Sequence, residues 1–396
     1  MLAYLPLLLC SVLASTASAV PLAPAGSNLA RDENVLLFDA PADETSTCPV
    51  QHLSTVQAYT YTNGSVDAVV NVFNGFLGAS GIEVDEKGLE ILRSRAKYFA
   101  TTPIGGKTVE LGVDGCEGGF SIGKTAVPNN STDDAGIAQD SGSLGHCDHT
   151  KTSTGRAVLR RGDQRSHTNT IYKSGKKGWM GCHFKYVFSE VYSILGTFPL
   201  TLPLDIDDTI KITGDGIDAI MATLIDEATP IPGIPAVYAT LTELIDPAWI
   251  YLTGSPWQLY GMLHDFIHQH FSASTGPILM KNLTYTGVDG LIEFLAEGTS
   301  LEYKAGRIDD IHSWYPGKQY LGIGDSSGND PEAYAYAYRQ YGSDWMKCIW
   351  IHQVEEGNNT AARWAEAFKG IPESVYKVYS NASELNPEAL PEGDCF

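Results

Sequence analysis

The chain has 396 residues, of which 43% are hydrophobic and 18% are charged, and this composition excludes an intrinsically disordered protein. Its 26 Lys and Arg face 47 Asp and Glu, which gives a formal net charge of −21. Because nucleic-acid affinity comes mainly from cations that neutralise phosphate, this charge argues against a nucleic-acid partner.

Residues 1–19 have the pattern of a cleaved signal peptide. Residues 2–13 are almost wholly apolar, and small residues that end in Ala17-Ser18-Ala19 follow them, as before a signal-peptidase site. Beyond this segment no apolar run reaches the ~20 residues that a membrane-spanning helix needs. We therefore predict a secreted, extracellular protein.

Cysteines and glycosylation sequons fit this prediction. Cleavage would remove Cys10 and leave Cys48, Cys116, Cys147, Cys182, Cys348 and Cys395. An even number of cysteines in an exported chain predicts three disulfides, whose pairing the sequence leaves open. Sequons begin at Asn63, Asn129, Asn130, Asn282, Asn358 and Asn381. They predict a glycoprotein.

The segment up to residue 195 divides into a lead and a domain. Residues 20–47 hold Pro, Ala and acidic residues without periodicity, so we expect a pro-segment or flexible lead. Residues 48–195 combine a helical face at residues 89–99 with short β-like runs such as 108–111, which predicts a mostly β N-terminal domain. Residues 129–155 are rich in Asn, Ser, Thr, Asp and Gly, which indicates a long loop.

Residues 151–185 contain nine basic residues and a single acid, Asp163. In so acidic a chain this is a local inversion of charge. Two interpretations stay open: a surface for an anionic membrane, or a solvated loop that balances acidic neighbours.

From residue 200 onward, strand-like and helix-like runs alternate. Residues 249–252, 320–323 and 346–351 are apolar runs typical of buried strands. Pro235 predicts the start of one helix, and Ser255 with Pro256 predicts the cap and first position of another. The alternation predicts a parallel sheet whose ligand site lies beyond the carboxyl ends of its strands.

Aspartates follow two of these strands. Asp205 and Asp207 are two residues apart, so an extended backbone places both side chains on one side. Asp325 and Asp330 follow a later strand, and together the four carboxylates predict a Mg²⁺ site. A first aspartate can attack phosphorus, and a second can protonate the leaving oxygen.

Two further polar residues complete a pattern for phosphoryl transfer. Thr253 stands at a strand end, where its hydroxyl can bind a phosphoryl oxygen. Lys304 can neutralise both the nucleophile and the charge that develops during transfer.

The order of these motifs resembles the haloacid dehalogenase (HAD) superfamily, and most closely the fungal actin-patch type of Mg²⁺-dependent phosphatidate phosphatase. The stretches that carry it are DIDDTIK from Asp205 to Lys211, Pro232-Gly233, residues 255–260, Lys304 twelve residues before Pro316, and residues 323–334. The resemblance implies an α/β fold, with a HAD-like Rossmannoid parallel sheet and a small cap over residues 196–385, followed by a tail at 386–396.

The resemblance also implies a role for each site residue. Asp205 would be the nucleophile, Asp207 the acid and base, Thr253 the phosphoryl clamp and Lys304 the charge stabiliser. The implied metal ligands are Asp205, Asp207 through its carbonyl, Asp325 and Asp330.

We therefore predict a secreted Mg²⁺-dependent phosphomonoesterase that works through an aspartyl-phosphate and converts phosphatidate to diacylglycerol and phosphate. Two alternatives stay open: a lipid- or glycan-binding protein on a degenerate phosphatase scaffold, and a phosphatase for soluble phosphomonoesters. Pro203 departs from the family pattern, and because proline removes a ladder donor we expect a distorted strand there. His264 and His268 have helical spacing for zinc, although a solvated histidine pair is the simpler interpretation.

Overall fold

The fold is given by a computed structural model of the chain. It describes residues 33–38, 42–44, 52–107, 109–113, 119–122, 136–145, 154–158, 167–170, 173–174, 187–188, 200–214, 223–281, 300–355 and 357–396. The predicted signal peptide and the cysteines Cys48, Cys116, Cys147 and Cys182 lie outside these residues. Of the basic segment 151–185 only short backbone strands are described. None of the described helices is both long and apolar enough to cross a bilayer.

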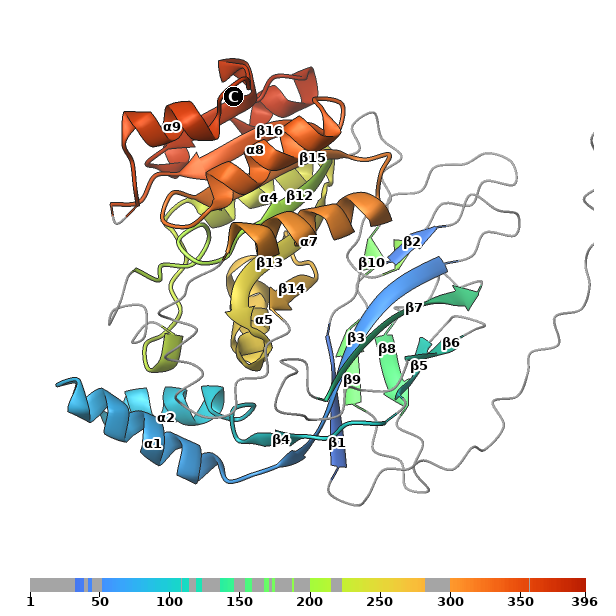
Figure 1. The fold of residues 1–396 in the computed structure, drawn as a ribbon, viewed down its shortest axis with the longest axis vertical. Coiled ribbons are helices and arrows are strands. Elements are labelled where there is room, and N and C mark those ends of the chain that lie inside the picture. Colours follow the sequence, from blue (N-terminus) through green and yellow to red (C-terminus); the bar gives the residue numbers. More distant parts are fainter. Residues whose placement is uncertain are drawn as a thin grey trace, which may run out of the picture.

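A parallel sheet forms the centre of the C-terminal half (Figure 1). Its strands are β12 (Leu200–Leu204), β13 (Ala248–Pro256), β14 (Ile278–Lys281), β15 (Gln319–Asp325), β16 (Met346–His352) and β17 (Tyr376–Tyr379). Their spatial order is β14-β13-β12-β15-β16-β17, and every neighbouring pair is parallel. The chain thus runs outward from β12 in both directions, and the two directions meet at β12 and β15.

Helices cover both faces of this sheet. They are α4 (Ile234–Ile245), α5 (Tyr260–His270), α7 (Leu301–Trp314), α8 (Asp330–Tyr341) and α9 (Ala361–Ala367). Trp249 and Tyr251 of β13 pack in one core with α4 and α5, whereas Ile250 and Leu252 pack in another with α7 and α8. This alternation follows from the two-residue period of a strand and explains why β13 is apolar throughout.

One expectation about this half is wrong, and a second, the irregularity at Pro203, is seen in the strand pairing. Ser255 and Pro256 do not open a helix: they end β13, a short 3-10 turn η1 (Trp257–Leu259) follows, and α5 begins at Tyr260. The Ser255 hydroxyl bonds to Asp207 instead of capping the helix. At Pro203, β12 keeps its register with β15, but no ladder pair forms between Thr201↔Tyr320 and Leu204↔Ile323. The missing proline N–H accounts for this gap.

The N-terminal half is rich in strands, as predicted. The long strand β3 (His52–Asn63) pairs antiparallel with β1 (Glu33–Leu37), β2 (Ala42–Glu44), β4 (Thr101–Pro103) and β7 (Ile137–Gly145). A second antiparallel sheet contains β5 (Val109–Val113), β6 (Gly119–Ile122), β8 (Thr154–Val158) and β9 (His167–Thr170). A two-stranded ribbon contains β10 (Lys173–Ser174) and β11 (Val187–Phe188). Helices α1 (Val66–Ala79) and α2 (Glu86–Arg95) follow β3.

Three of these strands lie where the sequence predicted irregular chain, since β2 as well as β1 falls in the expected lead 20–47. Strand β1 falls in the expected lead 20–47, and its Val35, Leu36 and Leu37 are buried. Strand β7 falls in the expected loop 129–155. Its polar, glycine-rich sequence does not predict a strand. The strand forms because its backbone hydrogen bonds go to β3, a partner about 80 residues away along the chain.

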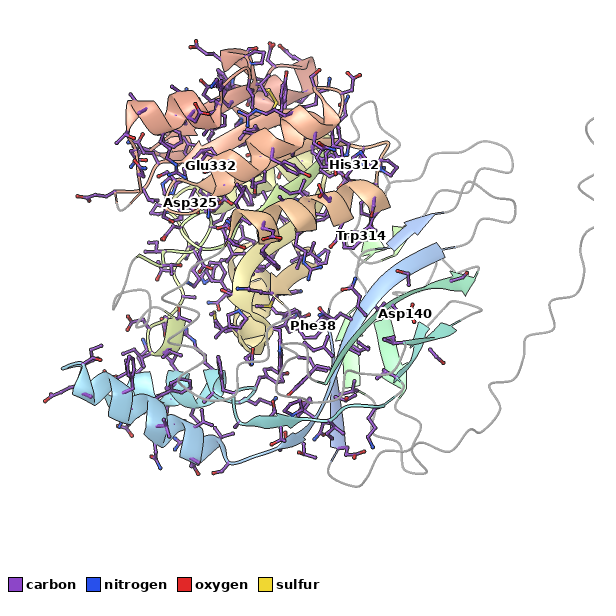
Figure 2. The ribbon with its side chains drawn as sticks, viewed as in Figure 1. Phe38, Asp140, His312, Trp314, Asp325 and Glu332 are labelled. Atoms are coloured by element: carbon purple, nitrogen blue, oxygen red, sulfur yellow. A yellow bond between two sulfur atoms is a disulfide. The ribbon has the colours of Figure 1, made fainter. Side chains whose placement is uncertain are left out.

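Aromatic side chains join the two halves. The Trp257 ring lies 3.9 Å from that of Tyr59, 6.1 Å from that of Tyr98 and 6.2 Å from that of Phe38, measured between ring centroids. Figure 2 labels Phe38 at this junction. Residues of both halves therefore share one hydrophobic core. Aromatic residues of the N-terminal half pack against Trp257, which directly follows β13.

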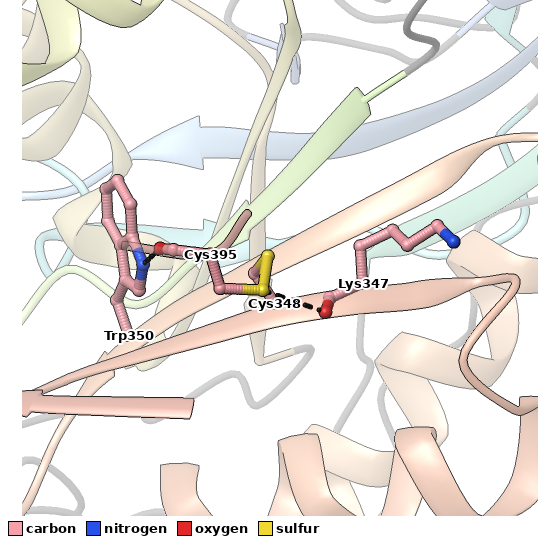
Figure 3. Close-up of a disulfide and its surroundings, with 4 residues drawn as sticks. All are labelled: Lys347, Cys348, Trp350 and Cys395. Carbon is pink, nitrogen blue, oxygen red and sulfur yellow. Dashed lines mark hydrogen bonds between the residues drawn. A yellow bond between two sulfur atoms is a disulfide. The ribbon is translucent and has the colours of Figure 1, made fainter. Parts of the chain in front are cut away.

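The C-terminus is tied back to the sheet by a disulfide. Cys395 bonds to Cys348 of β16, and the Trp350 indole N–H donates to the Cys395 carbonyl at 2.8 Å (Figure 3). The last turns η2 (Glu373–Val375), η3 (Ala382–Glu384) and η4 (Pro387–Glu392) lie between these anchors. The predicted tail 386–396 is thus packed against the fold at its end.

We expect the double variant Cys348→Ser/Cys395→Ser to unfold more easily while keeping its active-site geometry. The disulfide closes a loop of 47 residues, and removing it frees the unfolded chain at a cost of about 2–4 kcal/mol. Denaturant unfolding of the variant, compared with oxidised and reduced wild type, measures this loss. Equal unfolding free energies for the variant and the oxidised wild type would contradict it.

Candidate active site

The predicted site residues meet at the carboxyl ends of three adjacent strands. Asp205 directly follows β12, Thr253 belongs to the end of β13, and Asp325 is the last residue of β15. Lys304 comes from α7, and Asp330 is the first residue of α8. All five side chains are buried. Residues that are up to 125 positions apart in the sequence therefore form one cluster.

Lys304 lies at the centre of the carboxylates. Its Nζ donates to Asp205 Oδ1 at 2.8 Å and also bonds to Asp330 Oδ1. The other oxygen of Asp330 accepts the backbone N–H of Asp325 at 3.1 Å. Oxygens of Asp205, Asp325 and Asp330 all lie within 4.8 Å of one another. Two carboxylates of the triad thus bind the ammonium group directly, and the third lies beside them.

Burial and like charge raise the pKa values of two of these carboxyl groups. The pKa of Asp205 is raised well above its ordinary value, by burial and by the nearby Asp330, and Lys304 only partly opposes this. Burial also raises the pKa of Asp330 to about 6, again against the attraction of Lys304. Burial alone would lower the pKa of Lys304, but Asp205 and Asp330 outweigh it and keep the lysine charged.

The donor set fits a divalent metal ion. When all three carboxyl groups are ionised, the ammonium of Lys304 leaves two of their negative charges uncompensated in a buried site. Carboxylate oxygens are the ligands that hard cations such as Mg²⁺ prefer. The triad of Asp205, Asp325 and Asp330 can therefore hold such an ion.

Binding of a divalent metal ion, for example Mg²⁺, at this triad should release protons when the pH is near 6. Below that pH Asp330 holds a proton in the metal-free protein, and the ion must displace it, so apparent affinity rises with pH and levels off once the carboxyls are ionised. Calorimetric titration in two buffers of different ionisation enthalpy counts the protons released. Asp330→Asn should reduce that count, and a pH-independent affinity would contradict the prediction.

The Asp207 carboxylate lies outside the triad and accepts hydrogen bonds from a separate set of side chains. Its Oδ1 accepts from Lys211 Nζ at 3.1 Å and from Thr213 Oγ1 at 2.9 Å. Its Oδ2 accepts from Ser255 Oγ at 3.3 Å and from Thr253 Oγ1 at 3.4 Å. Burial works to raise the pKa of Asp207, but Lys211 and these hydrogen bonds outweigh it and lower it. Among the predicted metal ligands, Asp207 could thus contribute only its carbonyl.

A tight turn brings Lys211 beneath Asp207. The N–H groups of Ile210 and Lys211 both donate to the carbonyl of Ile206 at 3.0 Å, which folds the chain back. Asp208 takes a left-handed backbone conformation with φ 53°, which aspartate tolerates better than most residues. The His352 Nδ1 lies 2.7 Å from the Asp208 carbonyl and fixes the turn to β16.

Sequence reasoning missed Lys211, Thr213 and Ser255 as site residues. Lys211 stands within the quoted run DIDDTIK, and the signal that could have identified it is that it is the one cation of a run with three aspartates. Ser255 stands in the quoted stretch 255–260 but was expected to cap a helix, and Thr213 carried no signal; the turn and the end of β13 bring their hydroxyls to Asp207.

Two histidines of α5 stack on each other and lie apart from the aspartate triad. His264 and His268 stack with ring centroids 4.0 Å apart, and the His268 Nδ1 lies 2.9 Å from the His264 carbonyl. Within the described part of the chain, the aspartate triad is the one group of three or more His, Cys, Asp or Glu side chains close enough together to hold an ion. The zinc alternative therefore gains no support from the geometry.

The segment that carries this cluster is similar to known proteins. Residues 202–353 match the family model described as "Phosphatidate phosphatase APP1, catalytic domain". This segment is similar to a phosphatidate phosphatase catalytic domain. Phosphatidate phosphatase APP1 of Saccharomyces cerevisiae is 30% identical over 142 residues, which cover 35% of this chain and 23% of that protein. The predicted family resemblance is thus confirmed for the segment from Asp205 to Asp330.

Proposed function

We propose that this protein is a Mg²⁺-dependent phosphatase that removes the phosphate of phosphatidate and leaves diacylglycerol. The observation that carries the proposal is the meeting of Asp205, Thr253, Lys304, Asp325 and Asp330 at one end of the parallel sheet. The similarity of residues 202–353 to a phosphatidate phosphatase catalytic domain supports the substrate. The strand order, with Asp205 after the central strand, supports the assignment of a HAD-like fold. The proposed cap would lie among residues 206–233, of which 215–222 are not described.

Asp205 is the proposed nucleophile. One of its carboxylate oxygens attacks phosphorus, the bond from phosphorus to the ester oxygen breaks, and an aspartyl-phosphate forms. Lys304, bonded to Asp205 at 2.8 Å, offsets the charge of both the nucleophile and the phosphoryl oxygens. When bound at Asp205, Asp325 and Asp330, Mg²⁺ would neutralise further phosphoryl charge.

Asp207 is the proposed acid and base. It gives a proton to the departing ester oxygen and then takes one from the water that releases phosphate from Asp205. In the free protein Lys211 and its hydrogen bonds lower the pKa of Asp207, whereas the negative charge of a bound phosphate works in the opposite direction. Thr213 and Lys211 hold the carboxylate in place, and Thr253 and Ser255 supply hydroxyls on its other side.

We further propose that the protein is exported and works outside the cell. The signal-like residues 1–19 and the Cys348–Cys395 disulfide support this, because disulfides persist mainly in oxidising compartments. Contact between residues 151–185 and an anionic membrane is part of the same proposal and rests on their basic sequence. N-terminal sequencing tests the export. We expect the protein in culture medium with Val20 as its first residue, and protein that stays in the cells with Met1 intact would contradict the export.

Phosphate release from vesicles that contain phosphatidate tests the activity. We expect release with Mg²⁺, and none with EDTA. Activity that survives EDTA would refute the metal-dependent mechanism. Faster release from a soluble phosphomonoester would favour the soluble-substrate alternative. Binding of vesicles without turnover, and without trapping by beryllofluoride, would indicate a lipid-binding protein on a degenerate scaffold.

A further inference from the structure

The loop that joins β15 to α8 carries two of the three triad carboxylates. It runs from Asp325, the last residue of β15, to Asp330, the first residue of α8. Figure 2 labels Asp325 and Glu332, which lies in the first turn of α8, at the same end of the sheet. Arg363, on α9, bonds to this loop from outside the cluster of site residues.

Every N–H of the Arg363 guanidinium has an acceptor. Nε and Nη2 donate to the two carboxylate oxygens of Glu332 at 2.9 and 3.0 Å. Nη1 donates to the carbonyl of Ser326 at 2.5 Å and to that of Asn358 at 3.3 Å. Nη2 also donates to the carbonyl of Gly328 at 2.5 Å. Lysine has no planar fork of donors and could not reproduce this set.

The same loop is fixed to Asp325 on its inner side. Asp325 Oδ1 accepts the N–H of Ser327 at 2.5 Å and that of Gly328 at 3.3 Å, and it also bonds to the Ser327 hydroxyl. The amides of the loop thus orient Asp325, while its carbonyls are held by Arg363. Displacing the carbonyls of Ser326 and Gly328 would displace the amides that fix Asp325.

We propose that Arg363 is a positioning residue for the divalent metal ion. Together with Glu332 it fixes residues 326–328, so that Asp325 and Asp330 keep their carboxylates within reach of Asp205. The inference rests on the metal part of the proposed function. Arg363 lies beyond the matched segment 202–353, so the family similarity does not assign it a role.

Direct titration of the metal-free protein with Mg²⁺, without substrate, tests the role of Arg363. We expect Arg363→Lys to bind Mg²⁺ about 10–100-fold more weakly than wild type, as when an outer-shell partner of a ligand is lost. Glu332→Gln should weaken binding less, since the bonds from Arg363 to the two loop carbonyls remain. Phosphatidate turnover of each variant should need correspondingly more Mg²⁺.

Arg339 provides the matched control. It lies on α8 and its Nη2 donates to the carbonyls of Ala367 at 2.6 Å and Lys369 at 3.0 Å, so it joins α8 to the end of α9 without touching the loop. Arg339→Lys should lower thermal stability, because it too loses bonds to backbone carbonyls, and should leave Mg²⁺ affinity unchanged.

Three results would overturn the inference: wild-type affinity in Arg363→Lys, equal weakening in Arg339→Lys, or no Mg²⁺ binding by the wild type. If Arg363→Lys does not fold, Glu332→Gln decides, and an unchanged affinity there overturns the inference. Loss of Mg²⁺ affinity in Arg363→Lys, with no phosphatidate turnover by the wild type, would contradict the proposed substrate and leave the inference standing.

Discussion

Asp205→Asn is expected to abolish phosphatidate turnover, with kcat reduced by about 10⁴-fold or more, as when the attacking group of a covalent mechanism is removed. The amide has almost the size of the carboxylate but cannot attack phosphorus. Phosphate release from vesicles measures the loss, and an acid quench of wild type with labelled substrate should recover a phosphoenzyme that the variant lacks.

This loss should not come from unfolding. Burial and the nearby Asp330 already raise the pKa of Asp205, so a neutral side chain there removes repulsion between buried carboxylates. The variant should therefore be at least as stable as wild type in the metal-free state. Asp67→Asn is a suitable control, because Asp67 is 76% exposed and pairs with Arg93 on the surface. Substantial turnover by Asp205→Asn would refute the proposed nucleophile.

The arrangement of these aspartates could be predicted because it depends on strand ends. Buried parallel strands are near-continuous apolar runs, as at residues 319–325 and 346–352, and their carboxyl ends lie at one edge. Asp205 directly follows such a run and Asp325 is the last residue of another, so their proximity needed no knowledge of side-chain packing. Lys304 was predicted from its charge and its place in the order of the motifs, whereas nothing local in α7 marks it as buried.

What the sequence could not predict depends on pairing across long distances. Strand β7 is polar and forms a strand through its antiparallel backbone pairing with β3. The Ser255 hydroxyl binds Asp207 because β13 extends to Pro256, where local preference favoured a helix cap. Arg363 reaches the loop after β15 through the packing of α9 beside α8, and no sequence spacing encodes that contact.

Lys304→Met is expected to destabilise the metal-free protein by about 3–5 kcal/mol near pH 8, because it leaves buried carboxylates without their cation. Methionine keeps much of the apolar stem, so the loss reports mainly the charge. Urea unfolding with EDTA measures it. Turnover should also be lost, since Lys304 bonds directly to the proposed nucleophile. Lys369→Met, at a lysine that is 72% exposed, is the control for removing a surface charge.

The pH dependence of this loss separates charge from packing. Asp205 and Asp330 have raised pKa values in the folded protein, and without Lys304 these should rise further. A group whose pKa is higher in the folded state than in the unfolded state contributes stability at low pH, and that contribution is lost as pH rises through the folded value. The deficit of Lys304→Met should therefore be smaller at pH 5 than at pH 8. Adding Asp330→Asn should restore much of the stability at pH 8 and none of the activity. A deficit that is equal at both pH values would show that the lysine stem, and not its charge, holds this end of the sheet together.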